Sequence, residues 1–287
     1  MLLEKKIVEQ IESMQERLKE QGKLPTQDRL TAYYDLFRSK FGPEALRLLD
    51  GEELLDLMHN HGNHEGLVYW LEFKNDDEFP GRIFGSISGG SAHKFGLYKG
   101  KDTGEWIAGT APKNSRVIKI DEAIDIARKH RDQLILGCEL LEKLPTDGSD
   151  LDYKDLQEQI SELAPDVIDT AWGHKYFSLL YPAKLDDYHN ADYRRFHLTK
   201  LLQLIPLEPG RYVFGGRLIA IARELSLPIN HLTTVLNKMN GGPYSYWRIG
   251  TTVGDSGESY WGSMRDGNHV YLQYDDVFIS LAVSQPS

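Results

Sequence analysis

The amino-acid sequence predicts an α+β fold in which helices accompany a small antiparallel sheet. Apolar residues recur every three or four positions in 2–22 and 121–144, the period of amphipathic helices. Between residues 67 and 120, short apolar runs alternate with glycine-rich turns, a pattern typical of strands. With 40% hydrophobic and 10% aromatic residues, the chain can build packed cores.

Helices are expected at the amino terminus, before the first strand. Residues 2–22 place apolar side chains on one face, and Gly22 ends that helix. A second helix begins near Thr26, and the acidic sequence at 50–53 matches a capping box for a short third helix. The first of these helices is predicted from Leu3, Ile7, Ile11, Met14 and Leu18.

A meander of four or five strands should follow, because β-branched and aromatic residues dominate the segments between turns. Asp121 would cap the long helix after them, which ends near Pro145. The expected strands are 67–73, 82–87, 94–98, 105–108 and 116–120.

Three modules are predicted from these patterns: an α+β module at 1–145, a helical module at 151–240, and a β-rich segment at 241–287. The acidic stretch 146–150 would separate the first two. The last module offers only three candidate strands, at 246–249, 270–273 and 277–281, so we expect it to be incomplete.

The number of cysteines and the length of apolar runs predict the cellular compartment and whether the chain spans a membrane. Cys138 is the only cysteine, which excludes an internal disulfide framework and suits a reducing compartment. No run of about 18 apolar residues suggests a membrane span, and the first residues lack a signal-peptide core. We therefore expect a cytoplasmic protein with no membrane partner.

The charge is uneven along the chain. The net charge is -10, which argues against general affinity for nucleic acid. Residues 139–169 hold ten acids against two bases, whereas residues 184–248 hold nine bases against five acids. This second stretch indicates either a positive face or ordinary solvated helix surfaces.

No catalytic signature is present in the sequence. The chain lacks the glycine-rich phosphate loop with its lysine and the nucleophile elbow of hydrolases, and Cys138 lies in an apolar helix. We expect no cofactor, no hydrolysis of ATP or GTP, and no enzyme activity from this chain. The glycine cluster at 85–96 indicates a hairpin connection more than an anion-binding nest, and the three histidines in 59–65 an ordinary polar loop more than a zinc site.

Residues 216–238 have the spacing of a helix-turn-helix, a motif whose second helix enters the major groove. The alternative is a hairpin that only packs. Candidate groove-facing residues are Asn230, His231, Thr233, Thr234 and Asn237. The accompanying candidate contacts with nucleic acid are Arg194, Arg195, Arg211, Arg217, Arg223, Lys238, Trp247 and Arg248.

Several stretches resemble the region ahead of the motor in McrB-like AAA+ restriction GTPases and ATPases. They are LVYWLEFKND at 67–76, FGSISGGSAHKFGLY at 84–98, and WGHKYFSLLYP at 172–182 followed by YHN at 188–190. Residues 246–275 also resemble the start of an EVE- or PUA-like base-reading module. The resemblance carries no catalytic residue, because the motor's nucleotide-binding residues are absent from this sequence.

The resemblance implies a part of a restriction system that defends against phage and selects a target, often modified DNA, for a ring-forming motor. The motor in turn works with a nuclease subunit. We therefore expect a region that binds nucleic acid, with DNA as the favoured target. The alternative is a protein-interaction or phage-sensing scaffold that does not bind nucleic acid.

Overall fold

The structure of the chain is a computed structural model. It describes residues 3–87, 92–202, 210–243, 252–253, 258–259, 261–267, 269–274 and 277–282. The chain divides into two compact units, Met1–Pro243 and Tyr244–Ser287. The α+β class predicted from the sequence is confirmed.

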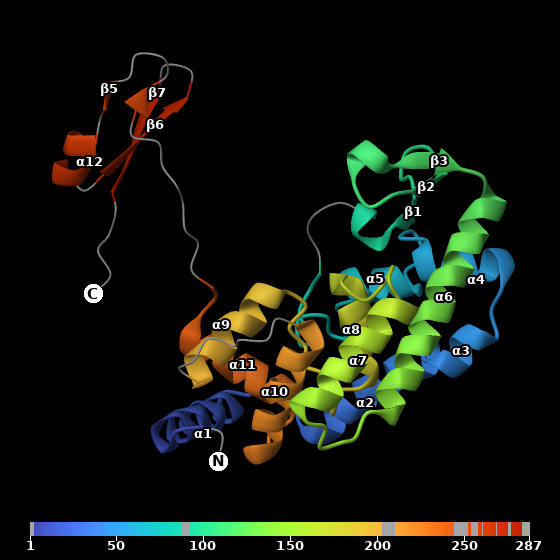
Figure 1. The fold of residues 1–287 in the computed structure, drawn as a ribbon, viewed down its shortest axis with the longest axis horizontal. Coiled ribbons are helices and arrows are strands. Elements are labelled where there is room, and N and C mark those ends of the chain that lie inside the picture. The colour runs from blue at the N-terminus through green and yellow to red at the C-terminus, as the bar shows by residue number, and fades with distance from the viewer. Residues whose placement is uncertain are drawn as a thin grey trace. The chain divides into compact units, whose positions relative to one another are not determined.

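Helices dominate the first unit (Figure 1). Amphipathic patterning explains most of them, and the Thr26 hydroxyl caps the second by accepting a hydrogen bond from the Arg29 amide. The helices are α1 (Lys5–Glu20), α2 (Gln27–Phe41), α3 (Pro43–Arg47), α4 (Gly51–His59), α5 (Leu67–Glu72), α6 (Ile120–Lys143), α7 (Asp150–Leu163), α8 (Ala171–Leu180), α9 (Ala191–Leu202), α10 (Arg211–Glu224) and α11 (Ile229–Asn240).

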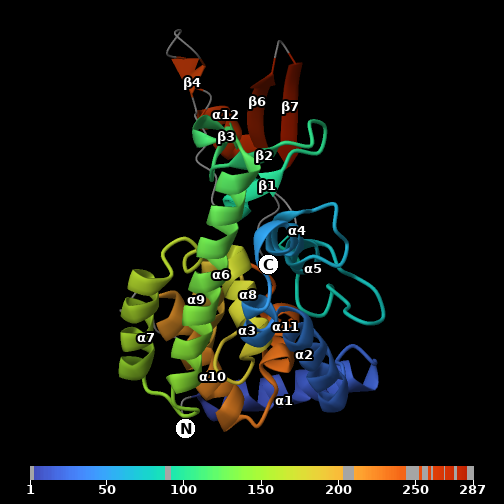
Figure 2. The ribbon, with the colours of Figure 1, turned by 90° about the vertical axis from the view of Figure 1, so that its right-hand side faces the viewer.

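A three-stranded antiparallel sheet lies at one end of α6 (Figure 2). Its strands β1 (Leu97–Lys99), β2 (Trp106–Ala108) and β3 (Arg116–Ile118) pair in sequence order. Leu97 lies opposite Ala108, and Trp106 lies opposite Ile118, so one face of the sheet is apolar and buried. Short 3-10 helices at Ala92–Phe95 and Pro112–Asn114 flank these strands.

Two of the predicted strands are wrong. Residues 67–72 form α5, which Phe73 ends, and residues 82–87 contain no strand. A short helix that is buried on nearly every side shows no polar face, so its apolar run has the same pattern as a buried strand. The predicted hairpin connection at 85–96 is only partly visible, because residues 88–91 lie outside the described residues.

One apolar cluster joins the sheet to helices α2 through α8. Leu144 and Tyr153, on either side of the predicted boundary at 145–151, both belong to it. Within the first unit, the acidic stretch connects α6 to α7, two helices that pack against each other. A second cluster unites α1 with α9, α10 and α11, and α1 packs along α11.

In the second unit, β4 (Thr252–Val253) pairs with β5 (Glu258–Ser259), and β6 (His269–Tyr274) pairs with β7 (Val277–Ala282). Helix α12 (Trp261–Gly267) precedes β6. The strands predicted at 270–273 and 277–281 are confirmed, and the one predicted at 246–249 lies outside the described residues. None of the helices in the described part of the chain is both long and apolar enough to span a membrane.

Candidate functional site

Arg194, a predicted contact with nucleic acid, is fully buried. Its Nε donates to Asp186 Oδ2 at 2.8 Å, and its Nη2 donates to the backbone oxygen of Tyr188. His174 Nε2 lies 2.8 Å from the same Nη2. The expectation that Arg194 contacts phosphate is therefore wrong, since its charge is neutralised inside the protein.

The groove-facing role predicted for the start of α11 is also wrong. The Asn230 amide donates to the Ile83 carbonyl at 2.8 Å and to Asp187 Oδ2 at 3.1 Å. Thr233 is buried and bonds within its own helix, and His231 Nε2 donates to the Pro25 carbonyl at 2.7 Å. Helices α10 and α11 do follow one another as predicted, but these three side chains are buried and bond to other parts of the protein or of α11, as the packing-hairpin alternative expects.

The other predicted cations differ in whether their side chains already bind other groups of the protein. Arg217 pairs with Asp150 at 2.9 Å, and Arg211 donates to the backbone oxygen atoms of His189 and Asp169. Arg223 is exposed and donates to the Thr146 carbonyl at 2.8 Å. Arg195 and Lys238 are exposed, and neither side chain makes a hydrogen bond or ion pair with any described residue. Trp247 and Arg248 lie outside the described residues.

A groove of about 600 Å³ gathers four of the predicted residues, namely Thr233, Thr234, Asn237 and Lys238. It lies where the segment before the sheet meets α9 and α11, and we call it the polar groove. Most of its lining side chains are aromatic or can form hydrogen bonds. The lining residues are Arg82, Ile83, Phe84, Gly85, Ser86, Asp187, Tyr188, His189, Asn190, Tyr193, Thr233, Thr234, Asn237 and Lys238.

Two cations and one acid set the charge of the polar groove. Arg82 and Lys238 are exposed and unpaired within the described part of the first unit. Burial raises the pKa of Asp187 to about 6, although a hydrogen bond from Asn230 opposes that rise. The groove is thus weakly cationic at neutral pH and becomes more so once Asp187 takes up a proton.

Several side chains of the polar groove keep unused hydrogen-bonding capacity. Asn237 Oδ1 accepts from the Tyr188 hydroxyl and from His197 Nε2, which leaves its amide hydrogens without a partner among the described residues. Asn190 likewise uses only its oxygen, as an acceptor for the Asp192 amide. The Tyr193 ring is 38% exposed and packs on Tyr188.

Phe84 and Gly85, which line the polar groove, each accept a hydrogen bond at the backbone carbonyl from a side chain of the protein interior. His189 Nε2 donates to the Phe84 carbonyl at 2.9 Å. Lys175 Nζ donates to the Gly85 carbonyl at 2.6 Å and to the Leu71 carbonyl at 2.7 Å. Burial lowers the pKa of Lys175 to about 7. Gly85 has φ +70°, a conformation that favours glycine.

Sequence reasoning missed Arg82, Tyr193 and Asp187 as groove residues. Arg82 precedes the glycine cluster and lies far outside the basic stretch, so no local signal joined it to Lys238. Asp187 and Tyr193 both precede Arg194 in the sequence, and the acidic pair 186–187 was the available sign of a buried ion pair.

The histidines at 59–65 are not all in a polar loop. His59 ends α4, is fully buried, and lies with its Nε2 3.2 Å from His130 Nδ1. His61 Nε2 lies 3.3 Å from Glu72, and His64 stacks on Tyr69. Across the described residues, no three His, Cys, Asp or Glu side chains are grouped as metal ligands.

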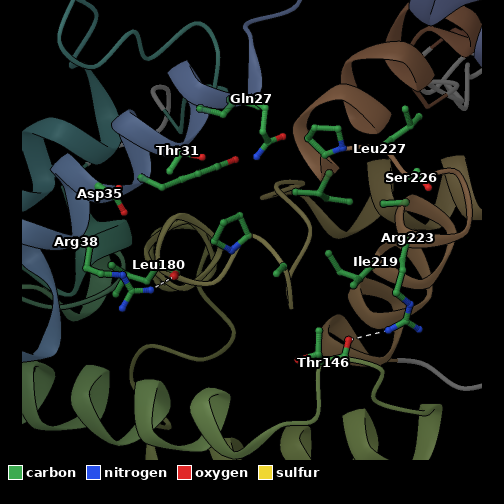
Figure 3. A pocket seen from close by; sticks show the side chains of 17 residues that line it. Gln27, Thr31, Asp35, Arg38, Thr146, Leu180, Ile219, Arg223, Ser226 and Leu227 are labelled. Carbon is green, nitrogen blue, oxygen red and sulfur yellow. Dashed lines mark hydrogen bonds between the residues drawn. The ribbon is translucent and has the colours of Figure 1, made fainter.

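A second cavity, which we call the apolar cleft, has a volume of about 560 Å³ (Figure 3). It separates α2 from the turn between α10 and α11, and Leu30, Ile219 and Ile229 form part of its apolar lining. Arg38 and Arg223 lie at its edges, where each guanidinium donates to a backbone carbonyl.

The polar groove can bind a planar, hydrogen-bonding anion, since it combines an exposed ring, amide donors and two cations. In comparisons with known proteins, no family model, no curated protein and no solved structure matches this chain.

Proposed function

We propose that this chain is a nucleic-acid recognition region and that the polar groove holds a nucleotide taken out of its stack. The observation that carries the proposal is the meeting of unpaired Arg82 and Lys238 with the exposed Tyr193 ring in one cavity. This proposal replaces the predicted recognition helix with a different surface of the same unit.

Size supports an unpaired nucleotide over a duplex. A cavity of about 600 Å³ lies within the range that encloses a small organic ligand. A base can enter such a cavity only when it is single-stranded or flipped from the helix. The Tyr193 ring would stack on it, an interaction that contributes about 1–3 kcal/mol per base.

The two cations would hold the flanking phosphates, and the unused amide hydrogens of Asn190 and Asn237 would contact the base. Phosphate contacts position the strand, whereas contacts with base edges determine which bases are preferred. Asp187 suits a base that presents a donor, because a carboxylate accepts from an exocyclic amine.

The experiment is a titration of labelled single-stranded and duplex DNA with the purified chain at two salt concentrations. Arg82→Glu and Lys238→Glu should each weaken binding of single strands, and Tyr193→Leu should weaken it by about 1–3 kcal/mol. Lys154→Glu is the matched control, because Lys154 is exposed on α7 and lines no part of the groove.

Equal weakening by Lys154→Glu and Lys238→Glu would mean that only net charge matters, and the groove would lose its role. Absence of binding to every strand form would reject nucleic-acid recognition and favour the protein-interaction alternative. The larger context also stays a proposal: a McrB-like motor and its nuclease subunit are partners that rest on the resemblance in residues 67–98 and 172–190.

A further inference from the structure

Helix α2 lines the apolar cleft with two parallel rows of side chains. Leu30, Tyr34 and Arg38 recur at four-residue spacing along the inner row. The outer row repeats the same spacing with Gln27, Thr31 and Asp35 (Figure 3). Because side chains four residues apart share a helix face, each row runs along the cleft.

The side chains of the outer row are polar and remain available for hydrogen bonds. Gln27, Thr31 and Asp35 are exposed, and none of their side chains makes a hydrogen bond or ion pair with the residues that the structure describes. Successive members rise by about 6 Å along the helix. Alternate residues of an extended peptide are about 6.6 Å apart, so the row matches the repeat of an extended backbone.

The opposite wall is apolar and includes one cation. Ile219 and Ala222 come from α10, and Leu227 and Pro228 from the following turn. Ser226 holds this turn in a left-handed conformation with φ 54°. Arg223 and Arg38 keep further N–H donors after bonding to their carbonyls, and guanidinium groups bind carboxylates in two-pronged pairs.

We propose that the apolar cleft binds an extended peptide segment of a partner protein that carries apolar side chains and an acidic residue. The apolar side chains lie between α2 and the α10–α11 turn. The peptide backbone bonds to the outer row of α2, and its carboxylate pairs with Arg223 or Arg38. Asp35 is one acid among the lining residues, so Arg38 and Arg223 leave a net positive charge that suits an acidic partner.

The test uses fluorescein-labelled nonapeptides with alternating leucines and one terminal charge position occupied by Glu, Gln or Lys. Fluorescence anisotropy with the full chain should show the Glu series binding most tightly and the Lys series most weakly. Thr31→Trp fills the cleft from an exposed helix position and should weaken binding at least about tenfold. Ala32→Trp adds the same ring at a neighbouring exposed position outside the cleft and should change nothing.

Arg223→Glu supplies a second variant that leaves the apolar walls intact, and it should reverse the preference between the Glu and Lys series. Octanoate and a labelled oligonucleotide are tested as alternative ligands of the apolar cleft. The proposal is overturned if no peptide binds, if Thr31→Trp and Ala32→Trp behave alike, or if octanoate displaces the peptide with equal affinity. Unchanged oligonucleotide binding by Thr31→Trp keeps this result separate from that of the polar groove.

Discussion

Arg194 and Arg195 are adjacent in sequence, but Arg194 is buried and Arg195 is exposed. Replacing each by Met therefore compares the stability contribution of a buried cation with that of a surface cation. Arg194 and its partner Asp186 are both fully buried. Arg194→Met would leave the Asp186 carboxylate with a hydrogen bond from the Tyr188 amide but without its counter-charge. Breaking a buried pair from one side costs about 3–5 kcal/mol.

For a unit of this size, about 1 kcal/mol lowers the melting temperature by roughly 2–4 °C. Arg194→Met should therefore lower it by roughly 6–20 °C. Arg195 is exposed and unpaired among the described residues, so Arg195→Met should stay within about 0.5 kcal/mol of the parent protein.

Urea denaturation, followed by circular dichroism, measures both free energies of unfolding. The double variant Asp186→Asn/Arg194→Met removes both charges, and its loss should be smaller than the sum of the two single losses. The reasoning fails if Arg194→Met keeps full stability while nucleic-acid binding falls, because that outcome would place Arg194 at the surface.

Three further predictions concern the core and the polar groove. Burial lowers the pKa of His130 to about 4, so as the pH falls from about 6.5 to 4 the unfolded chain takes up the proton first, and His130 alone should contribute a drop of about 3 kcal/mol to the free energy of unfolding. His130→Gln should reduce this drop in pH-dependent urea melts, and an unchanged pH profile would contradict the assignment. Gly137→Ala would place a Cβ 2.4 Å from Phe177 Cζ and should cost about 1–3 kcal/mol in thermal unfolding, whereas a neutral result would mean that α6 and α8 can separate. Single-strand affinity should rise as the pH falls through about 6, because Asp187, which lines the same groove as Arg82 and Lys238, becomes neutral, and Asp187→Asn should abolish that rise in anisotropy titrations.

Helices with a clear polar face could be predicted from the sequence. The predicted second helix begins at the Thr26 cap, and the long helix predicted after Asp121 is α6. The predicted Asp121 cap is wrong, because α6 begins at Ile120 and Asp121 lies within its first turn. Asp50 precedes α4 as expected, but its carboxylate binds Arg128 at 2.7 Å and does not cap the helix. The α5 segment failed because burial on every side removes the periodicity that distinguishes a helix.

The candidate site depended on information that a linear pattern does not hold. Arg194 counted as a surface charge because its counter-ion, Asp186, becomes its neighbour only when the loop before α9 folds back. Asn230 looked like a base-reading residue, yet it bonds to the Ile83 carbonyl across 147 positions of chain. Asn237 and Lys238 line the polar groove because both are exposed in the last turn of α11, whereas its first turn is buried in the core.

The salt dependence of single-strand binding tests the polar groove most directly. For the parent protein and for Arg82→Met/Lys238→Met, the logarithm of the association constant is measured against the logarithm of salt concentration. Each lost phosphate contact on a single strand lowers the magnitude of the slope by about 0.7, so the double variant should lose about 1.4. An identical slope for the two proteins would show that Arg82 and Lys238 do not contact phosphate, and the polar groove would not be the nucleic-acid site.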